Sequence, residues 1–214
     1  EVFDKSISNK FKTDLKIKFP YCLMPQKEGF TFKLSSGVMI LSKYPLELIK
    51  HVVFDVSKKS DKGAQKGCSL VKININNKAI FLAGTHLDSK NNNSRSLQYQ
   101  ITNDEILKPY LNDSIPLLIA GDFNTDFKSS QYDSMMTSFK LKNFELNDDR
   151  PYTFDEFNTW NDKGYKAWID FIFYQENKNI KVFNQYILRP VMKYKNTKMD
   201  LADHYQIVIE AVIY

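Results

Sequence analysis

Apolar residues that recur every three or four positions predict three helices in this chain. Three segments show this spacing: residues 4–17, 94–108 and 129–139. In the first segment, Ile7, Phe11 and Leu15 share one stripe, and Asp4 or Ser6 stands where a helix cap is favoured. The spacing therefore predicts an N-terminal helix and two more helices further along the chain.

Short apolar runs and alternating segments predict strands between these helices. Residues 68–75 alternate apolar and polar side chains, which is typical of a strand with one face toward a core. The Asn76-Asn77 step that follows, ahead of a second β-rich run, predicts a tight hairpin. Strands are expected at residues 38–41, 46–55, 68–75, 79–84, 115–121, 167–174, 180–188 and 205–214.

These elements predict an α+β fold in one domain. Many of the strands follow one another directly, which favours a layered sandwich with a largely antiparallel sheet. Several strands show little alternation, which indicates that both faces of the sheet are covered. A chain of 214 residues suits one domain, and neither an internal repeat nor a Gly-, Ser- or Pro-rich linker divides it. We therefore treat residues 1–214 as a single domain.

Composition narrows the class of protein. Hydrophobic residues make up 43% of the chain, so a packed core can form and global disorder is excluded. No run approaches the roughly 18 apolar residues of a membrane-spanning helix. The opening EVFDKSISNK is not a signal peptide, and the compartment stays open, a secreted or periplasmic location included.

Charge and cysteine content exclude further classes. The net charge of +5 permits a phosphate-rich partner without requiring one. Only three arginines are present, which disfavours a protein that reads DNA sequence. The two cysteines, Cys22 and Cys68, are too few for a disulfide scaffold or a cysteine-based zinc site, and one bridge between them stays open.

Polar residues stand at or near the expected ends of several strands, where placement is rigid and solvent is accessible. They are His86, Asp122, Asn124, Asp170, Asp203 and His204. Taken singly, most have an ordinary structural explanation, because an aspartate forms turns and a histidine can be satisfied by hydrogen bonds in the core. Asp170 is harder to explain in that way, because it interrupts an apolar run and a buried carboxylate needs a partner. Together these residues form a set typical of an active site.

This set of side chains suits one kind of reaction. Asp and Asn oxygens beside water are suitable ligands for a hard divalent cation such as Mg²⁺. A hard cation and a strand-end histidine suit phosphodiester hydrolysis, in which neutral imidazole deprotonates the attacking water. That histidine needs a carboxylate to fix its tautomer, and Asp170 is the candidate. Neither a Gly-x-Ser-x-Gly motif nor a Gly-rich phosphate loop is present.

Four motifs resemble those of the endonuclease/exonuclease/phosphatase superfamily in their order and spacing. They are GTHLDS at 84–89, GDFN at 121–124, WIDFIFY at 168–174 and ADHYQIVI at 202–209. The resemblance covers nearly the whole chain. It implies a deoxyribonuclease-like fold, a four-layer α/β sandwich in which two facing, largely antiparallel sheets are flanked by helices.

The resemblance also implies a role for each matching residue. His204 would be the general base, Asp170 would orient it, and His86 would contact a phosphate oxygen. Asp122 and Asn124 would hold the attacking water and the phosphate near the metal.

A metal site formed by Glu1, Asp203 and Asp122 is implied as well. Glu1 resembles the metal-binding glutamate of the family, which ends a strand and precedes an apolar pair and a helix. On this interpretation, the chain lacks the first strand of the family fold. The expected ion is Mg²⁺, with Mn²⁺ or Ca²⁺ as alternatives.

Within the superfamily, the chain is most similar to the sphingomyelinase C-like phosphodiesterases. The similarity rests on SSGVMILSKYP at 35–45, on Lys66-Gly67 and on THLDS with Arg95 downstream. It implies that Lys66 and Arg95 bind the substrate.

Three hypotheses follow for the function. The first is a Mg²⁺-dependent, monomeric phosphodiesterase that hydrolyses a sphingomyelin-like lipid and makes peripheral contact with a membrane. The second is a nuclease of the same fold, in which the aromatic-rich segment 152–168 grips nucleic acid. The third is a catalytically silent binding module.

Overall fold

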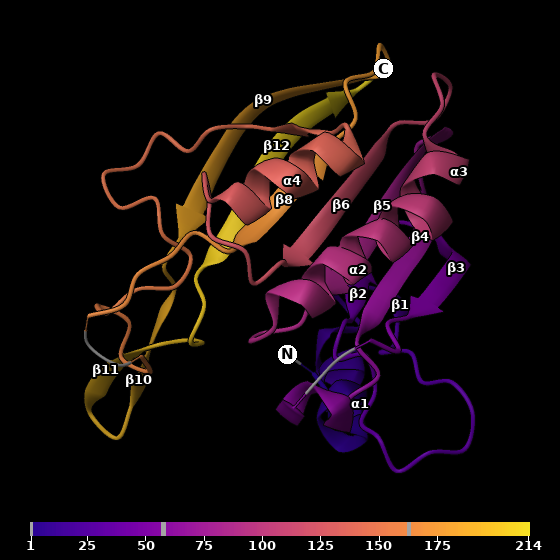
Figure 1. Cartoon of the computed structure of the whole chain (residues 1–214). Coiled ribbons are helices and arrows are strands. Elements are labelled where there is room, and N and C mark those ends of the chain that lie inside the picture. The colour runs from indigo at the N-terminus through magenta and orange to yellow at the C-terminus, as the bar shows by residue number, and fades with distance from the viewer. Residues whose placement is uncertain (1, 57–58, 162–163) are drawn as a thin grey trace.

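The computed structural model describes residues 2–56, 59–161 and 164–214, and its centre is a six-stranded sheet (Figure 1). The strands, in spatial order, are β3 (Leu46–Val53), β4 (Gly67–Ile75), β5 (Lys78–His86), β6 (Leu117–Asp122), β8 (Asp170–Tyr174) and β7 (Lys142–Asn143). The pair β5–β6 is parallel, and every other neighbouring pair in this sheet is antiparallel. The largely antiparallel sheet predicted from the sequence is therefore confirmed.

The hairpin between β4 and β5 forms where the asparagine pair predicts it. Asn76 and Asn77 have φ angles of 48° and 68°, in the left-handed region that a type I′ turn requires and asparagine tolerates. The register then runs without interruption from the Ile75–Lys78 pair to the Cys68–Thr85 pair. A local turn thus fixes the register of the strand that ends in His86.

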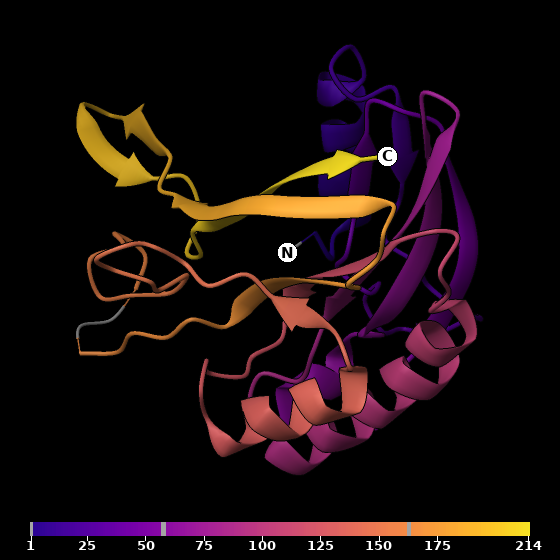
Figure 2. The same ribbon diagram turned by 90° about the horizontal axis from the view of Figure 1, so that it is seen from above.

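Helices cover one face of this sheet, as Figure 2 shows. They are α2 (Asn92–Thr102), the π-helical turn η2 (Asn103–Leu107), α3 (Lys108–Tyr110) and α4 (Ser130–Phe139). The first three form one helical segment, which confirms the helix expected at 94–108 and extends it at both ends. Ser129 caps α4, because its Oγ accepts the backbone N–H of Tyr132.

The main core lies between the sheet and these helices. Phe123, Phe171 and Phe173 are fully buried there. The rings of Phe171 and Phe173 stack, and Phe123 meets Phe173 edge-on with the centroids 5.0 Å apart. Phe139 reaches the same cluster from α4. Because Phe123 directly follows Asp122, the aromatic core anchors the end of β6 and the polar residues beside it.

Two shorter strand pairs lie over the opposite face of the sheet. They are β1 (Tyr21–Leu23) with β2 (Ile40–Ser42), and β9 (Ile180–Leu188) with β12 (Gln206–Ile213), both antiparallel. Leu23 and Ile40 pack on Val71 and Ile73 of β4. Both faces of the sheet are therefore covered, and the expected α+β sandwich of the deoxyribonuclease-like kind is confirmed.

The first helix forms as predicted but shows its apolar stripe to solvent. The Asp4 carboxylate caps α1 (Lys5–Leu15) by accepting the N–H groups of Ser6 and Ile7. Ile7 and Phe11, however, are 50% and 42% exposed. Spacing predicted the helix because spacing is local, whereas burial depends on what packs against the helix.

One hairpin was not predicted. It consists of β10 (Val191–Tyr194) and β11 (Thr197–Asp200), joined by Lys195 and Asn196 at positive φ. Nearly every residue of this hairpin is exposed, so no buried face imposes a pattern on its sequence. A short 3₁₀ helix, η1 (Lys59–Gly63), leads into β4.

Three sequence expectations concern the chain as a whole. Cys22 and Cys68 are both free thiols, so the bridge left open between them does not form. No helix among the described residues is long and apolar enough to cross a membrane. Within the described part of the chain, one edge of β12 pairs with β9 and the other with no strand. The single domain that lacks a first strand stays a prediction.

Candidate active site

Strand register brings three of the expected residues to one edge of the central sheet. His86 at the end of β5 pairs in register with Asp122 at the end of β6. Asp122 in turn pairs with Asp170, the first residue of β8. The three side chains come from positions far apart in the sequence, and the sheet places them on consecutive strands.

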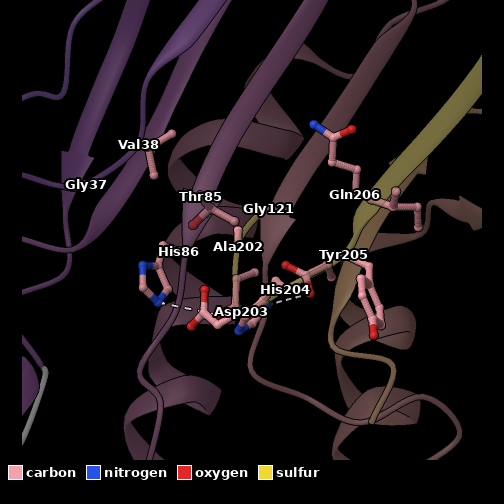
Figure 3. A pocket seen from close by; sticks show the side chains of 13 residues that line it. Gly37, Val38, Thr85, His86, Gly121, Ala202, Asp203, His204, Tyr205 and Gln206 are labelled. Atoms are coloured by element: carbon pink, nitrogen blue, oxygen red, sulfur yellow. Dashed lines mark hydrogen bonds and ion pairs between the residues drawn. The ribbon is translucent and has the colours of Figure 1, made fainter. Parts of the chain in front are cut away.

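A cavity of about 320 Å³ opens at this edge (Figure 3). Its lining includes His86, Asp122, Asp170, Asp203 and His204. The loop before β12 contributes the last two of these residues, and the segment before β2 closes the other side with Gly37 and Val38. The cavity is therefore the place where the predicted catalytic residues meet.

His204 and Asp170 form a hydrogen-bonded pair within this cavity. The Nδ1 atom of His204 lies 2.8 Å from a carboxylate oxygen of Asp170. Burial lowers the pKa of His204, but the hydrogen bond and the charge of Asp170 outweigh burial and raise this pKa to about 9. A carboxylate that accepts a proton from Nδ1 leaves Nε2 as the basic nitrogen.

Asp122 and Asn124 form a second unit at the end of β6. The backbone N–H of Asn124 donates to one oxygen of the Asp122 carboxylate at 2.7 Å, and the Asn124 amide donates to the other oxygen at 3.0 Å. Asn124 adopts a φ of 49°, a left-handed conformation that asparagine tolerates better than most residues. This turn fixes the amide beside the carboxylate.

The donor set in the cavity fits a divalent cation. Asp122, Asp170 and His204 each offer one ligand atom, and these atoms all lie within 4.8 Å of one another. Burial and then the neighbouring Asp170 carboxylate raise the pKa of Asp122 to about 7. Two partly buried carboxylates on neighbouring strands favour the binding of positive charge between them.

His86 has a different electrostatic environment from that of His204. The Nζ atom of Lys66 lies 2.9 Å from His86 Nε2 and 2.7 Å from the carbonyl oxygen of Leu87. The same Nζ lies 3.0 Å from the Asp61 carboxylate. Burial and then the positive charge of Lys66 lower the pKa of His86 to about 3, so its imidazole is neutral at ordinary pH.

The remaining expected site residues lie at increasing distance from this centre. Asp203 is exposed and lines the cavity. Lys66 touches His86 but lies beneath the cavity surface, 3% exposed. Arg95 is buried against α4 and the loop after β5, where it donates to the Asp88 carbonyl and to Gln131. Glu1 lies outside the described residues, so its metal-binding role stays a prediction.

One residue that holds the site together was not identified from the sequence. Thr153 is fully buried, and its hydroxyl oxygen accepts the backbone N–H groups of Ile169 and Asp170, each at 3.1 Å. Its carbonyl oxygen accepts the N–H of Tyr205, the residue after His204, at 2.7 Å. Thr153 thus ties both halves of the Asp170–His204 pair to one point. A single buried threonine has no motif that would have revealed it.

Comparison with known proteins agrees with this geometry. Residues 1–204 match the model of the Endonuclease/Exonuclease/phosphatase family. The chain is 28% identical to a phospholipase C of Staphylococcus aureus over 69% of this chain and 49% of that protein. It is 26% identical to a sphingomyelinase C of Listeria ivanovii over 97% of this chain and 72% of that protein.

Solved structures show the same fold. A beta toxin variant from Staphylococcus aureus with bound magnesium ions superimposes with a TM-score of 0.82 at 20% identity, over 100% of this chain and 84% of that chain. At this level of identity, the likeness shows the fold alone. The chain spans about half the length of the phospholipase C that it matches.

Proposed function

Because the chain belongs to the Endonuclease/Exonuclease/phosphatase family, we propose that it is a divalent-metal-dependent phosphodiesterase that acts on a sphingomyelin-like lipid. The observation that carries this proposal is the Asp170–His204 pair, held 2.8 Å apart in the cavity that Asp122 also lines, with Asn124 bonded to the Asp122 carboxylate. This arrangement places a base, His204, beside a carboxylate that could bind a divalent cation.

The base would act through Nε2 of His204 in its neutral form. A cation bound nearby would favour that form by lowering the pKa of His204, which is about 9 in the metal-free protein. The Nε2 atom takes a proton from a water molecule, and the water oxygen attacks phosphorus as the bond to the leaving alcohol breaks. Asp170 stabilises the imidazolium that forms, because its carboxylate already accepts the Nδ1 proton. The leaving oxygen, on the opposite side of phosphorus, takes a proton from solvent, and the imidazolium returns its proton to solvent. The products would be an alcohol and a phosphomonoester.

Residues in and beside the cavity would hold the phosphate. Asn124 holds its amide between the Asp122 carboxylate and the Leu87 carbonyl, and it would contact a phosphate oxygen by exchanging one of these two hydrogen bonds. His86 lines the same cavity and would contact a phosphate oxygen, and its neutral imidazole adds no charge there. Asp122, Asp203 and Glu1 would hold Mg²⁺, or Mn²⁺ or Ca²⁺ in its place. When bound, such a cation would neutralise phosphate charge that builds up during the reaction.

Two observations favour a lipid over a nucleic acid. The first is that relatives matched by sequence bear the names phospholipase C and sphingomyelinase C. The second is that all three arginines make contacts within the fold: Arg95 with the Asp88 carbonyl, Arg150 with Asp155 at 3.9 Å, and Arg189 with Asp148 at 3.0 Å.

Parallel assays of lipid and plasmid hydrolysis test the proposal. We expect phosphocholine release from sphingomyelin with Mg²⁺, no release with EDTA, and no nicking of supercoiled plasmid. His204→Ala should lower the rate by roughly 10²–10⁴-fold in a protein that remains folded by circular dichroism. His51→Ala is the matched control, because His51 contacts Ser69 outside the cavity.

Each other outcome contradicts a named part of the proposal. Plasmid nicking without phosphocholine release would replace the lipid substrate with nucleic acid. A parental rate in a folded His204→Ala protein would remove the assignment of the base. Inertness toward both substrates with Mg²⁺, Mn²⁺ and Ca²⁺ would favour the silent binding module.

A further inference from the structure

The loop between β1 and β2 holds two phenylalanine side chains fully in water. Phe30 and Phe32 have relative exposures of 103% and 100%. Their rings meet edge-on with centroids 6.5 Å apart. Single exposed apolar residues are common on protein surfaces, but two neighbouring rings that are completely exposed mark an interaction site.

This loop leads directly to the wall of the catalytic cavity. Leu34, two residues after Phe32, lines a small hollow with Lys66 and Ser89 beside the end of β5. The loop then reaches Gly37 and Val38, which line the cavity itself. In Figure 1, the loop projects from the end of the molecule at which β5 and β6 terminate. The loop that carries the two rings therefore lies at the same end of the molecule as the proposed active site.

A basic hairpin projects at the same end of the molecule. The β10–β11 hairpin carries the exposed residues Lys193, Lys195 and Lys198, and it runs into the loop that supplies His204 to the cavity. Its acidic residue, Asp200, is buried and accepts the N–H of Thr159 at 2.8 Å. The outer surface of this hairpin is therefore positively charged.

From this arrangement we propose that the cavity end docks on an anionic phospholipid bilayer. Phe30 and Phe32 enter the interfacial layer of the membrane, and the lysines of the β10–β11 hairpin contact anionic headgroups. This proposal rests on the proposed lipid substrate. It specifies that the substrate is a lipid that is still part of a bilayer. Docking at two points on this end of the molecule presents the catalytic residues to the membrane surface.

The two contacts should differ in their response to charge. Around the rings, Lys27 is offset by Glu28, and Lys33 lies 3.6 Å from the Asp55 carboxylate. The aromatic contact is therefore nearly neutral, and its strength should depend little on salt or on lipid charge. The hairpin carries the electrostatic attraction, which salt screens.

Vesicle sedimentation tests these two contacts separately. The probes are phosphatidylcholine vesicles with and without phosphatidylserine, in EDTA so that no metal-dependent turnover alters the lipid. The double variant Phe30→Ser/Phe32→Ser should bind both kinds of vesicle about tenfold more weakly than the parent, or weaker still. Lys193→Gln/Lys195→Gln should lose about fivefold per lysine, on phosphatidylserine vesicles only.

Phe183→Ser is the matched control for the aromatic variant. Phe183 is 52% exposed in the first half of β9, which pairs near Ile213 at the opposite end of the molecule. This variant should bind vesicles as the parent does. All variants should keep the parental unfolding temperature, because the substituted side chains are exposed.

Several results would overturn the docking proposal. Equal vesicle binding by the parent and by Phe30→Ser/Phe32→Ser would do so, as would a parent that binds no vesicles. A dimer in sedimentation velocity that this variant abolishes would assign the rings to a second copy of the chain instead.

Enzyme assays separate docking from the proposed function. If Phe30→Ser/Phe32→Ser lowers hydrolysis of vesicle lipid but leaves hydrolysis of a soluble short-chain phosphodiester unchanged, both proposals are supported. If the protein binds vesicles through the two rings but hydrolyses no lipid, the docking proposal is supported and the proposed phosphodiesterase activity on lipids is contradicted. If vesicle lipid is hydrolysed equally by parent and variant, the function stands and docking falls.

Discussion

At the scale of single residues, the two histidines of the cavity have pKa values that are shifted in opposite directions. The hydrogen bond and charge of Asp170 raise the pKa of His204 to about 9, against the effect of burial. Burial and then the charge of Lys66 lower the pKa of His86 to about 3. The difference arises because one imidazole has an acidic partner and the other a basic one. It suits His204 to move a proton and His86 to remain neutral.

The first prediction concerns the pKa of His204 in the metal-free protein. We expect an NMR titration of its imidazole to give a value near 9. Asp170→Asn should lower that value, since it removes the hydrogen bond and the charge that most strongly oppose burial and leaves only Asp122 and Asp203 to raise the pKa. His51, whose pKa is lowered by burial, serves as an internal reference. If the pKa of His204 were the same in the parent and in Asp170→Asn, the proposed role of Asp170 would be contradicted.

The raised pKa of His204 also determines whether the free energy of unfolding rises or falls with pH. A histidine whose folded pKa lies above its unfolded value stabilises the fold fully below the unfolded pKa, about 6.5. This contribution is lost as pH rises through about 9. The free energy of unfolding of the metal-free protein should therefore fall across this window more steeply for the parent than for Asp170→Asn.

At the scale of secondary structure, the close approach of β5 and β6 determines where His86 and Asp122 meet. Gly121 is the register partner of Thr85, and a Cβ at Gly121 would lie 1.9 Å from the Thr85 carbonyl oxygen. No side chain fits in that space. The glycine is therefore required by the strand pairing one residue before the proposed active-site pair.

The second prediction follows from that contact. Gly121→Ala should lower the free energy of unfolding by about 1–3 kcal/mol and also reduce phosphodiesterase activity, because β6 must shift away from β5. Gly63→Ala is the matched control, since a Cβ at Gly63 would meet nothing within 4 Å. Chemical denaturation measures the free energy of unfolding of both variants. Equal stability of the two variants would show that β6 accommodates a side chain.

The third prediction tests the clamp at Thr153. Thr153→Val keeps the shape of the side chain but leaves the buried N–H groups of Ile169 and Asp170 without their acceptor. We expect a loss of about 1–3 kcal/mol in the free energy of unfolding, with a larger fall in kcat than in KM. Thr153→Ser should restore both, because it restores the hydroxyl. Failure of serine to rescue would assign Thr153 a packing role only.

At the scale of the whole molecule, the cavity concentrates negative charge where two layers of the sandwich meet. Asp122 and Asp170 come from the central sheet, and Asp203 comes from the loop that leads into β12 on the other layer. A cation bound between Asp122 and Asp203 would link the layers. Metal binding should therefore be visible in global stability as well as in activity.

The fourth prediction is a metal-dependent shift in unfolding temperature. At a Mg²⁺ concentration about 100 times its dissociation constant, the native state gains about 2.7 kcal/mol, which corresponds to roughly 5–10 °C for a chain of this size. Asp122→Asn should abolish this shift. It should also raise the unfolding temperature of the metal-free protein at pH 8, because the pKa of Asp122 is raised to about 7 and its ionisation above that pH costs stability.

Asp113→Asn controls for the general effect of removing a charge, since Asp113 is an exposed aspartate outside the cavity lining. It should respond to Mg²⁺ as the parent does. A shift that survives in Asp122→Asn would place the metal away from Asp122.

Local patterns in the sequence determined most of the elements and the list of candidate residues. The Asn76-Asn77 turn, the Asp4 cap and the strand that ends in Asp122 were all predicted, because turns, caps and short apolar runs depend on neighbouring residues. The hairpin of β10 and β11 was missed for the same reason: its exposed residues carry no pattern.

The tertiary structure alone decided which of these residues meet and which partners they have. Asp170 and His204 are 34 positions apart, and Thr153 binds the backbone of both their segments. Arg95, expected at the substrate, instead has its guanidinium bonded within the fold. Burial, hydrogen-bond partners and pKa are set by atoms from distant strands, and a single sequence carries no local signal of that proximity.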